Sequence, residues 1–389
     1  MKVAFIIDSV FRYGGAQRVT SIIASELAKN NDVYIINTKP VNEDYELYKL
    51  SRNVKIFNLS KRNTYHIFLH SICKVLQIVN KNTKILNKFE KLKEYIYYKN
   101  DNYLFKEFYD IYCIEKFDYI IGVEIDQAMI PIMLKDKIEK STKIIAWQHN
   151  SSEQYFETFG TFYWNQKDIM KKYLPLFDNY IVLTEHDKEK NKELFNIESV
   201  VINNTRTFNS KEKATLNNKI FIAAGRYDKQ KGFDLLIKSF KIFSNYDDEW
   251  ILNIFGEGKE RRKLQRLIDK YNLNDRVFLK GFTKNIKQEL LNSSIYLLSS
   301  RNEGMPMIIL ESNELGLPSI CYDIPTIGDV IIDKYNGLIV KSFNINQFAQ
   351  AMIYLTTSDL KQYSYNAIQL SKKFELKNIM KKWEKLLNE

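Results

Sequence analysis

The 389-residue sequence has few of the residues that build metal centres or disulfide frameworks. It contains three cysteines, Cys73, Cys113 and Cys321, and only four histidines. An odd number of widely spaced cysteines without a C-x-x-C pair supports neither a disulfide framework nor a zinc site. We therefore expect no structural metal and no disulfide bonds.

Long apolar runs are also missing. No window approaches the ~18 uninterrupted apolar residues of a spanning helix, and the nearest candidate, 119–134, contains Glu124 and Asp126. The opening segment MKVAFIIDSV does not read as a signal peptide, because its apolar run is short and Asp8 interrupts it. We expect a cytoplasmic protein, or one peripheral to the inner face of the cell membrane.

Acidic residues are absent from 47–89, where nine basic residues occur. Together with a net charge of +11, this bias indicates an anionic partner. Apolar residues within the stretch mark one helical face, and a basic helix with such a stripe can lie on an anionic bilayer. The default reading is a domain helix whose apolar face packs on a sheet. The face comprises Phe68, Leu69, Ile72, Val75, Leu76 and Val79.

The first half of the chain reads as a Rossmann-like domain. A buried strand at 2–7 is followed by Gly14-Gly15 and a helix from Ala16. The glycine pair would let a backbone approach a ligand closely, although a tight strand-to-helix turn explains it equally well. The turn lacks G-x-G-x-x-G, which disfavours an NAD enzyme. Another strand, at 143–146, precedes His149, which is placed either to bind a ligand or simply to form a turn.

A polar segment at 203–210 has no periodicity, and we interpret it as an interdomain linker. The strand-loop-helix pattern then restarts at 219–224 and leads to Arg226 and Lys231. Two cations at a strand-to-helix junction can converge on a diphosphate, although a solvated basic loop has the same pattern. Later strands end at the glycine loops 256–258 and 281–283.

The most informative stretch, 299–311, follows an apolar strand at 295–298. It turns at Gly304, and Pro306 suits the first helical position. A strand, a glycine turn and a helix N-terminus form an anion site. Glu303 and Glu311 frame this site and are suited to accept hydrogen bonds from hydroxyls. A sugar nucleotide supplies both the phosphate and the hydroxyls.

Together these motifs resemble the family 4 glycosyltransferases of the GT-B architecture. Residues 14–19 match G-G-A-E-R-V except at Gln17, which puts only a family contact at that position in doubt. Residues 225–232 match G-R-x-x-x-x-K-G, and residues 303–311 match E-x7-E. The order of segments also resembles bacterial enzymes that extend lipid-linked or surface polysaccharides.

The resemblance implies an α/β fold with two doubly wound Rossmann-like domains facing a cleft. Residues 1–203 would bind the acceptor, 204–373 would bind the nucleotide sugar, and a helix at 374–389 would return to the first domain. It implies a retaining hexosyltransferase that moves a hexose or N-acetylhexosamine from a nucleotide sugar to a glycan, forming an α-linkage. UDP is the family's usual nucleotide. No metal is expected, and no D-x-D pair is present to hold one.

The resemblance also assigns roles to residues. Arg226 and Lys231 would hold the donor diphosphate, Glu303 the transferred sugar and Glu311 the ribose, while His149 would touch the sugar. Gly15 and the amides around Met307 and Ile308 would approach the phosphates, and the two glycine loops would enclose the base. The catalytic set is Glu303, Arg226, Lys231 and His149. The substrate-binding set is Gly14, Gly15, Arg226, Lys231, Gly256, Glu257, Gly281, Phe282, Glu303, Gly304, Met305, Pro306, Met307, Ile308 and Glu311.

No second carboxylate is evident in the first domain as a nucleophile, so a front-face reaction is favoured, in which the leaving phosphate helps to deprotonate the acceptor. Two alternatives remain. One is another GT-B enzyme, such as a sugar-nucleotide epimerase or a phosphorylase. The other is a basic binding protein without catalysis, although no nucleic-acid-binding motif appears and we expect no nucleic-acid partner.

Overall fold

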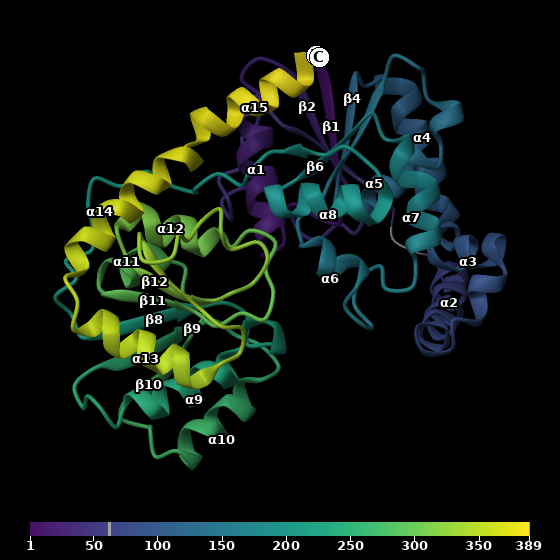
Figure 1. The fold of residues 1–389 in the computed structure, drawn as a ribbon. Coiled ribbons are helices and arrows are strands. Elements are labelled where there is room, and N and C mark those ends of the chain that lie inside the picture. The colour runs from purple at the N-terminus through teal and green to yellow at the C-terminus, as the bar shows by residue number, and fades with distance from the viewer. Residues whose placement is uncertain (61–63, 389) are drawn as a thin grey trace. The chain divides into compact units, whose positions relative to one another are not determined.

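The computed structural model describes residues 1–60 and 64–388. The chain forms two compact units (Figure 1). Unit 1 comprises Met1–Asn203 and Met380–Glu389, and unit 2 comprises Asn204–Ile379. Lys61 and Arg62 of the predicted basic stretch lie outside the described residues.

Unit 1 is built on a seven-stranded parallel sheet of order β3-β2-β1-β4-β5-β6-β7. Its central strands are short runs of buried apolar residues, as expected for a sheet covered on both faces. The direction of strand order reverses between β1 and β4, so the loops after these two strands diverge there. The strands are β1 Lys2–Ile7, β2 Asp32–Asn37, β3 Lys55–Asn58, β4 Tyr119–Val123, β5 Lys143–Trp147, β6 Asn179–Val182 and β7 Val200–Val201.

The helices of unit 1 connect these parallel strands. Thr184 caps α8, because its hydroxyl accepts a hydrogen bond from the Asp187 N–H at 3.1 Å. The α-helices are α1 Gly15–Leu27, α2 Thr64–Thr83, α3 Glu90–Tyr97, α4 Asn102–Glu115, α5 Ile125–Ile132, α6 Ser152–Phe156, α7 Lys167–Tyr173 and α8 Glu185–Phe195.

Unit 2 has the same architecture, built on a six-stranded parallel sheet of order β10-β9-β8-β11-β12-β13. Its strand order reverses between β8 and β11. The strands are β8 Ile220–Ala224, β9 Ile251–Phe255, β10 Val277–Gly281, β11 Ile295–Leu298, β12 Ser319–Tyr322 and β13 Gly337–Val340. The α-helices are α9 Phe233–Phe243, α10 Arg261–Lys270, α11 Ile286–Leu291, α12 Met307–Leu315, α13 Ile345–Thr356 and α14 Leu360–Ser371.

The terminal helix α15, Leu376–Asn388, joins unit 1 from residue 380 onward. Trp383 is fully buried, and its ring lies 4.9 Å from that of Trp147 and 6.2 Å from that of Phe5. The Tyr119 hydroxyl donates to the Leu387 carbonyl at 2.6 Å. These contacts confirm that the C-terminal helix returns to the first sheet, and the two parallel sheets confirm the doubly wound fold class.

The chain passes from unit 1 to unit 2 between Asn203 and Asn204, within the segment interpreted as the interdomain linker, but residues 204–207 are anchored to unit 2. Asn204, Thr205 and Arg206 are buried. The Arg206 guanidinium pairs with Glu314 on α12 and, at 3.1 Å, with Glu375. A polar sequence without periodicity can be a satisfied buried network as well as a solvated linker.

Arg206→Met is expected to lower the free energy of unfolding by about 3–5 kcal/mol, because it leaves Glu314 buried without its main partner. Urea unfolding checks this value. Lys219→Met, which removes an exposed partner of Glu249, is the control and should change stability by less than about 1 kcal/mol. Equal effects of the two changes would contradict the buried ion pair.

The default reading of the basic amphipathic helix is wrong. On α2 only Cys73 and Asn80 are buried. The predicted apolar stripe points outward, with Phe68 66% and Val75 60% exposed. The helix packs instead through a small apolar cluster of Cys73, Leu86 and Ile96, against which Leu69 lies. Polar contacts add to it, because the Gln77 amide donates to the Ile96 carbonyl and His70 contacts Asn100. None of the helices in residues 1–60 and 64–388 combines the length and hydropathy needed to span a bilayer.

Candidate active site

In unit 2 the loops after β8 and β11 meet at the point where the strand order reverses. The Arg301 N–H donates to the Gln230 carbonyl at 2.7 Å, and the Ser299 hydroxyl donates to the Lys231 carbonyl at 2.9 Å. Gly232, between these loops, has φ +64°, and a Cβ there would lie 2.0 Å from the Ser299 carbonyl oxygen. Doubly wound sheets bind ligands at this position.

This junction brings Lys231 and Glu303 together although 72 residues separate them. The Lys231 ammonium lies 2.7 Å from Glu303 Oε1, and the Ser300 hydroxyl donates to the same oxygen at 2.6 Å. Glu303 is 8% exposed. An ammonium has three donors, so the contact with Glu303 leaves two for an anion. One cation can therefore hold a carboxylate and bind phosphate.

Arg226 has a different environment. Its side chain is 76% exposed, and its contact with Asp228 measures 3.4 Å. It lies on the same loop as Lys231 but makes no contact with Glu303 in the described part of the chain. The guanidinium is therefore available to an incoming anion.

The helix after Glu303 begins one residue later than predicted. Pro306 is the N-cap of α12, with ψ 105°, and the helix starts at Met307. Gly304, Met305 and Pro306 are buried, whereas Met307 and Ile308 are half-buried. The N–H groups of a first helical turn have no intrahelical acceptor, so those of Met307 and Ile308 can bind an anion.

Glu311 is only 2% exposed, and its Oε1 accepts a hydrogen bond from the Thr207 hydroxyl at 2.6 Å. In the free protein this carboxylate therefore accepts a hydrogen bond from a hydroxyl of the chain itself. Sequence reasoning missed Thr207, because this residue lies within the segment interpreted as a linker.

Three glycines lie side by side at the ends of neighbouring strands β8, β9 and β10. The Gly256 N–H donates to the Gly281 carbonyl at 2.8 Å, and a Cβ at Gly256 would lie 1.8 Å from the Gly225 carbonyl oxygen. The predicted loops are thus tightly joined. Glu257 pairs with Arg261 at 2.9 Å, and Phe282 is exposed at the same edge.

In unit 1, Gly14 and Gly15 open α1, and the Gly14 N–H donates to the Tyr48 hydroxyl at 2.9 Å. The departure from the family motif at Gln17 has a local reason. Its amide donates to Asp8 Oδ1 at 2.9 Å, whereas a glutamate would place two carboxylates in contact.

His149 follows β5 at the carboxyl edge of the sheet. It is 8% exposed, and its ring centroid lies 4.3 Å from that of Trp147. Burial lowers the pKa of the imidazole to about 3, so His149 is neutral near pH 7. Its Nε2 has no hydrogen-bond partner in the described residues.

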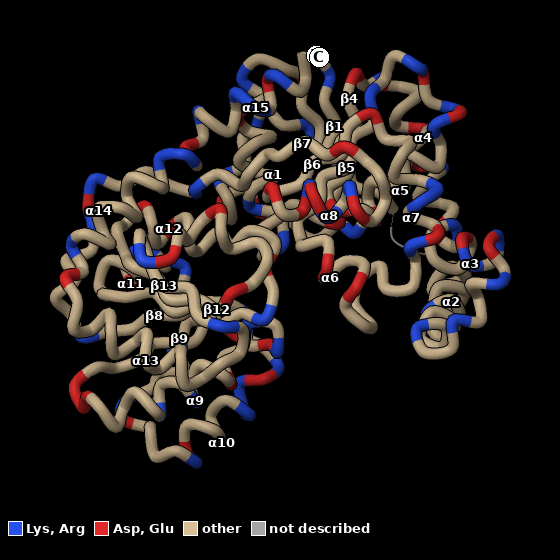
Figure 2. Tube along the Cα trace, viewed as in Figure 1, with Lys and Arg blue, Asp and Glu red and all other residues tan. Residues whose placement is uncertain are grey.

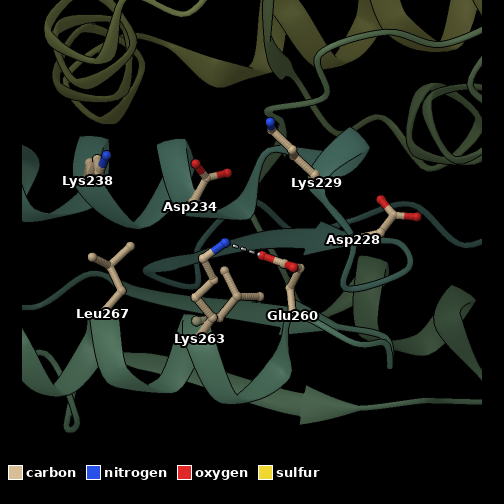
Figure 3. A pocket seen from close by; sticks show the side chains of 8 residues that line it. Asp228, Lys229, Asp234, Lys238, Glu260, Lys263 and Leu267 are labelled. Atoms are coloured by element: carbon tan, nitrogen blue, oxygen red, sulfur yellow. Dashed lines mark hydrogen bonds and ion pairs between the residues drawn. The ribbon is translucent and has the colours of Figure 1, made fainter. Parts of the chain in front are cut away.

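The residues predicted to bind the donor do not line the small cavity shown in Figure 3. That cavity, of about 180 Å³, lies between α9 and α10. Its walls carry paired charges, such as Lys263 with Glu260 at 2.8 Å, which indicates a structural crevice. Within residues 1–60 and 64–388, no group of three or more His, Cys, Asp or Glu could hold a metal ion.

The protein has two Rossmann-like sheets, and in unit 2 the loops after β8 and β11 meet where the strand order reverses. These features define the class of GT-B proteins. Residues 204–370 match the family model "Glycosyl transferases group 1". An uncharacterized glycosyltransferase of Haemophilus influenzae is 25% identical, with 99% of each chain covered. The amylovoran biosynthesis glycosyltransferase AmsD of Erwinia amylovora is 24% identical over 100% of this chain and 99% of its own.

A crystal structure of S. aureus TarM, in complex with fondaparinux, alpha-GlcNAc-glycerol and UDP, superposes with a TM-score of 0.76. It is 18% identical, with 100% of both chains covered, and confirms the fold. Residues 204–370 are thus similar to the group 1 glycosyltransferases, and the two relatives that match along nearly the whole chain are glycosyltransferases. The protein is an enzyme that transfers a sugar from a nucleotide sugar.

Proposed function

We propose that the enzyme transfers a hexose or N-acetylhexosamine from a UDP-sugar to a glycan acceptor, with retention to an α-linkage and without a metal. The Lys231–Glu303 pair, beside the N-terminus of α12, carries the proposal because it joins a phosphate ligand to a hydroxyl acceptor. The TarM complex, which holds UDP and alpha-GlcNAc-glycerol, supports the nucleotide and the linkage. AmsD, which is named for amylovoran biosynthesis, supports a polysaccharide acceptor.

In this proposal unit 2 binds the donor. Lys231, Arg226 and the first-turn amides of Met307 and Ile308 hold the diphosphate and stabilise the charge that grows on it as the glycosidic bond breaks. Glu303 accepts hydrogen bonds from hydroxyls of the transferred sugar. Glu311 binds the ribose, and the glycine loops at 256–258 and 281–283 enclose the base.

In this proposal unit 1 binds the acceptor, with Gly15 and His149 as its candidate ligand-binding residues. The acceptor oxygen attacks the anomeric carbon on the face from which the nucleotide leaves. The carbon–phosphate-oxygen bond breaks as the new glycosidic bond forms, and a phosphate oxygen takes the acceptor proton. No enzymic nucleophile is needed in this reaction.

A donor screen tests this function. UDP-, GDP- and ADP-sugars are incubated with the protein, with and without lipid-linked acceptors, and released nucleotide is measured. We expect UDP release that EDTA does not reduce and an α-linked product by NMR. No release with any donor would contradict the transferase, and an isomerised or phosphorylated sugar would indicate another GT-B enzyme.

We further propose that the outward face of α2 and α3 binds an anionic membrane surface. The large apolar side chains exposed here are Tyr65, Ile67, Phe68, Ile72, Val75, Leu76, Ile78, Val79, Ile85, Phe89, Leu92 and Tyr95. Lys74, Lys84, Lys88 and Lys91 are also exposed, against a single exposed acid, Glu90, between residues 64 and 95. Figure 2 marks these basic positions in blue. Apolar residues among lysines suit the headgroup region of an anionic bilayer.

Vesicle flotation tests this membrane face. The protein should float with phosphatidylglycerol-containing vesicles and not with pure phosphatidylcholine, and salt should weaken binding because the lysines contribute through Coulomb attraction. Replacing Phe68, Ile72 and Val75 together with Ser should lower vesicle affinity at least ~10-fold. The matched control replaces Tyr354 and Tyr365, exposed apolar residues of unit 2, and should bind normally. A dimer in solution that does not float would show that a second copy covers this face.

A further inference from the structure

One carboxylate in unit 1 has a conformation that its side chain disfavours. Glu124 directly follows β4 and has φ 74° and ψ 153°. This region is essentially restricted to glycine, because a Cβ clashes with the backbone there. The unit therefore holds a glutamate where glycine would be less strained.

The Glu124 side chain makes little structural contribution in return. It forms no capping hydrogen bond to α5, and its Oε1 accepts only a long one, 3.4 Å, from the Asn150 amide. Its Oε2 is buried without a partner in the described residues. Its backbone N–H donates to the Trp147 carbonyl at 2.9 Å, a bond that any residue except proline can make.

The position of Glu124 is where a ligand would be expected. The unit 1 sheet reverses its strand order between β1 and β4, and Glu124 stands at the carboxyl end of β4. The Ser9 hydroxyl after β1 and His149 Nε2 after β5 are also without hydrogen-bond partners in the described residues. Ser9 is fully buried, and His149 is more than nine-tenths buried. Three neighbouring strands thus end in unsatisfied polar atoms, which is rare for buried groups without a ligand.

Burial, with Asp126 and Asp8 nearby, raises the pKa of the Glu124 carboxyl to about 8. At neutral pH the group is mainly protonated and can both donate and accept a hydrogen bond. A sugar hydroxyl has the same dual capacity. The environment therefore favours a hydroxyl-bearing ligand over an anion or a metal ion.

We propose that Glu124 is an acceptor-binding residue, whose carboxyl group hydrogen-bonds a hydroxyl of the glycan that receives the sugar. The inference rests on the proposed function and deepens it, because it assigns a specific contact to the acceptor side. The sequence could not reveal Glu124, because its only signal is a backbone conformation.

The test uses the full-length protein and two readouts, acceptor-dependent transfer and the slower release of nucleotide without acceptor. Glu124→Gly should raise the KM for acceptor at least ~10-fold, because a buried hydrogen bond is lost. Nucleotide release without acceptor should stay within about 2-fold, and the Tm should equal or exceed that of the wild type, because glycine relieves the strain. Glu124→Gln, which keeps a donor and an acceptor, should retain part of the acceptor affinity.

Lys116→Gly is the matched control. Lys116 precedes the same strand and also has positive φ, 53°, but lies at the opposite edge of the sheet. The Lys116→Gly variant should therefore leave the KM for acceptor unchanged. An unchanged KM in Glu124→Gly would overturn the inference while leaving the proposed function intact. Wild-type protein that releases no nucleotide from any donor would overturn both.

Discussion

Lys231→Met is expected to lower kcat/KM for sugar transfer by about 10²–10³-fold, the usual loss when one preorganised charge donor is removed. Lys231 stands where the loops after β8 and β11 meet, and its ammonium keeps two donors for the diphosphate beyond its contact with Glu303. Steady-state kinetics with a UDP-sugar measure the loss. Lys229→Met, two residues away on the same turn, is the matched control and should stay within about 2-fold of the wild type.

Lys231→Met should also lower stability, because Glu303 is 8% exposed and would lose its counter-charge. The double variant Lys231→Met/Glu303→Gln removes both charges, so its Tm should recover towards the wild type while transfer stays low. This pattern separates a catalytic loss from an unfolding loss. Recovery of transfer in the double variant would contradict the role assigned to Lys231.

Glu303→Gln is the second change with a large expected effect, a loss of about 10²-fold or more in kcat. Its carboxylate accepts hydrogen bonds from Ser300 and Lys231 in the free protein and would accept them from the transferred sugar. An amide keeps the shape, but its NH₂ end cannot accept a hydrogen bond. Loss in kcat with little change in KM would indicate a contact that strengthens in the transition state.

Affinity for free UDP gives the control for Glu303→Gln. The nucleotide carries no transferred sugar, so calorimetry should show UDP binding within about 3-fold of the wild type. Glu311→Gln should show the opposite pattern, with weaker UDP binding, because Glu311 is assigned to the ribose. Wild-type kcat in Glu303→Gln would remove that residue from the site.

The sequence was most informative where local rules act. Parallel strands covered on both faces appear as short apolar runs, and a glycine or proline after such a run marks the turn at the carboxyl edge. The stretches 219–232 and 295–311 could therefore be placed at strand ends and assigned an anion-binding chemistry. The helix start was misplaced by one residue at Pro306, because proline fits both the cap and the first turn.

The sequence was least informative about which surfaces are covered. The stripe of α2 has the periodicity of a core-packed helix, yet Phe68 and Val75 are exposed. Periodicity shows that apolar residues share a face, but not what that face contacts. The polar segment after residue 203 is the reverse case, because it lies at the boundary between the units and yet its Arg206 and Thr207 have partners on α12.

By itself the sequence determined the resemblance to a family, the two repeated βα patterns and the residue types of the candidate donor site, because these follow from motif order and hydrophobic periodicity. Only the tertiary structure decided which residues meet. Strand order in a doubly wound sheet is not chain order, so β11 lies beside β8 and brings Glu303 to Lys231 across 72 residues. The strained backbone of Glu124 likewise became visible only in three dimensions, because the surrounding fold, and not the local sequence, imposes its φ and ψ.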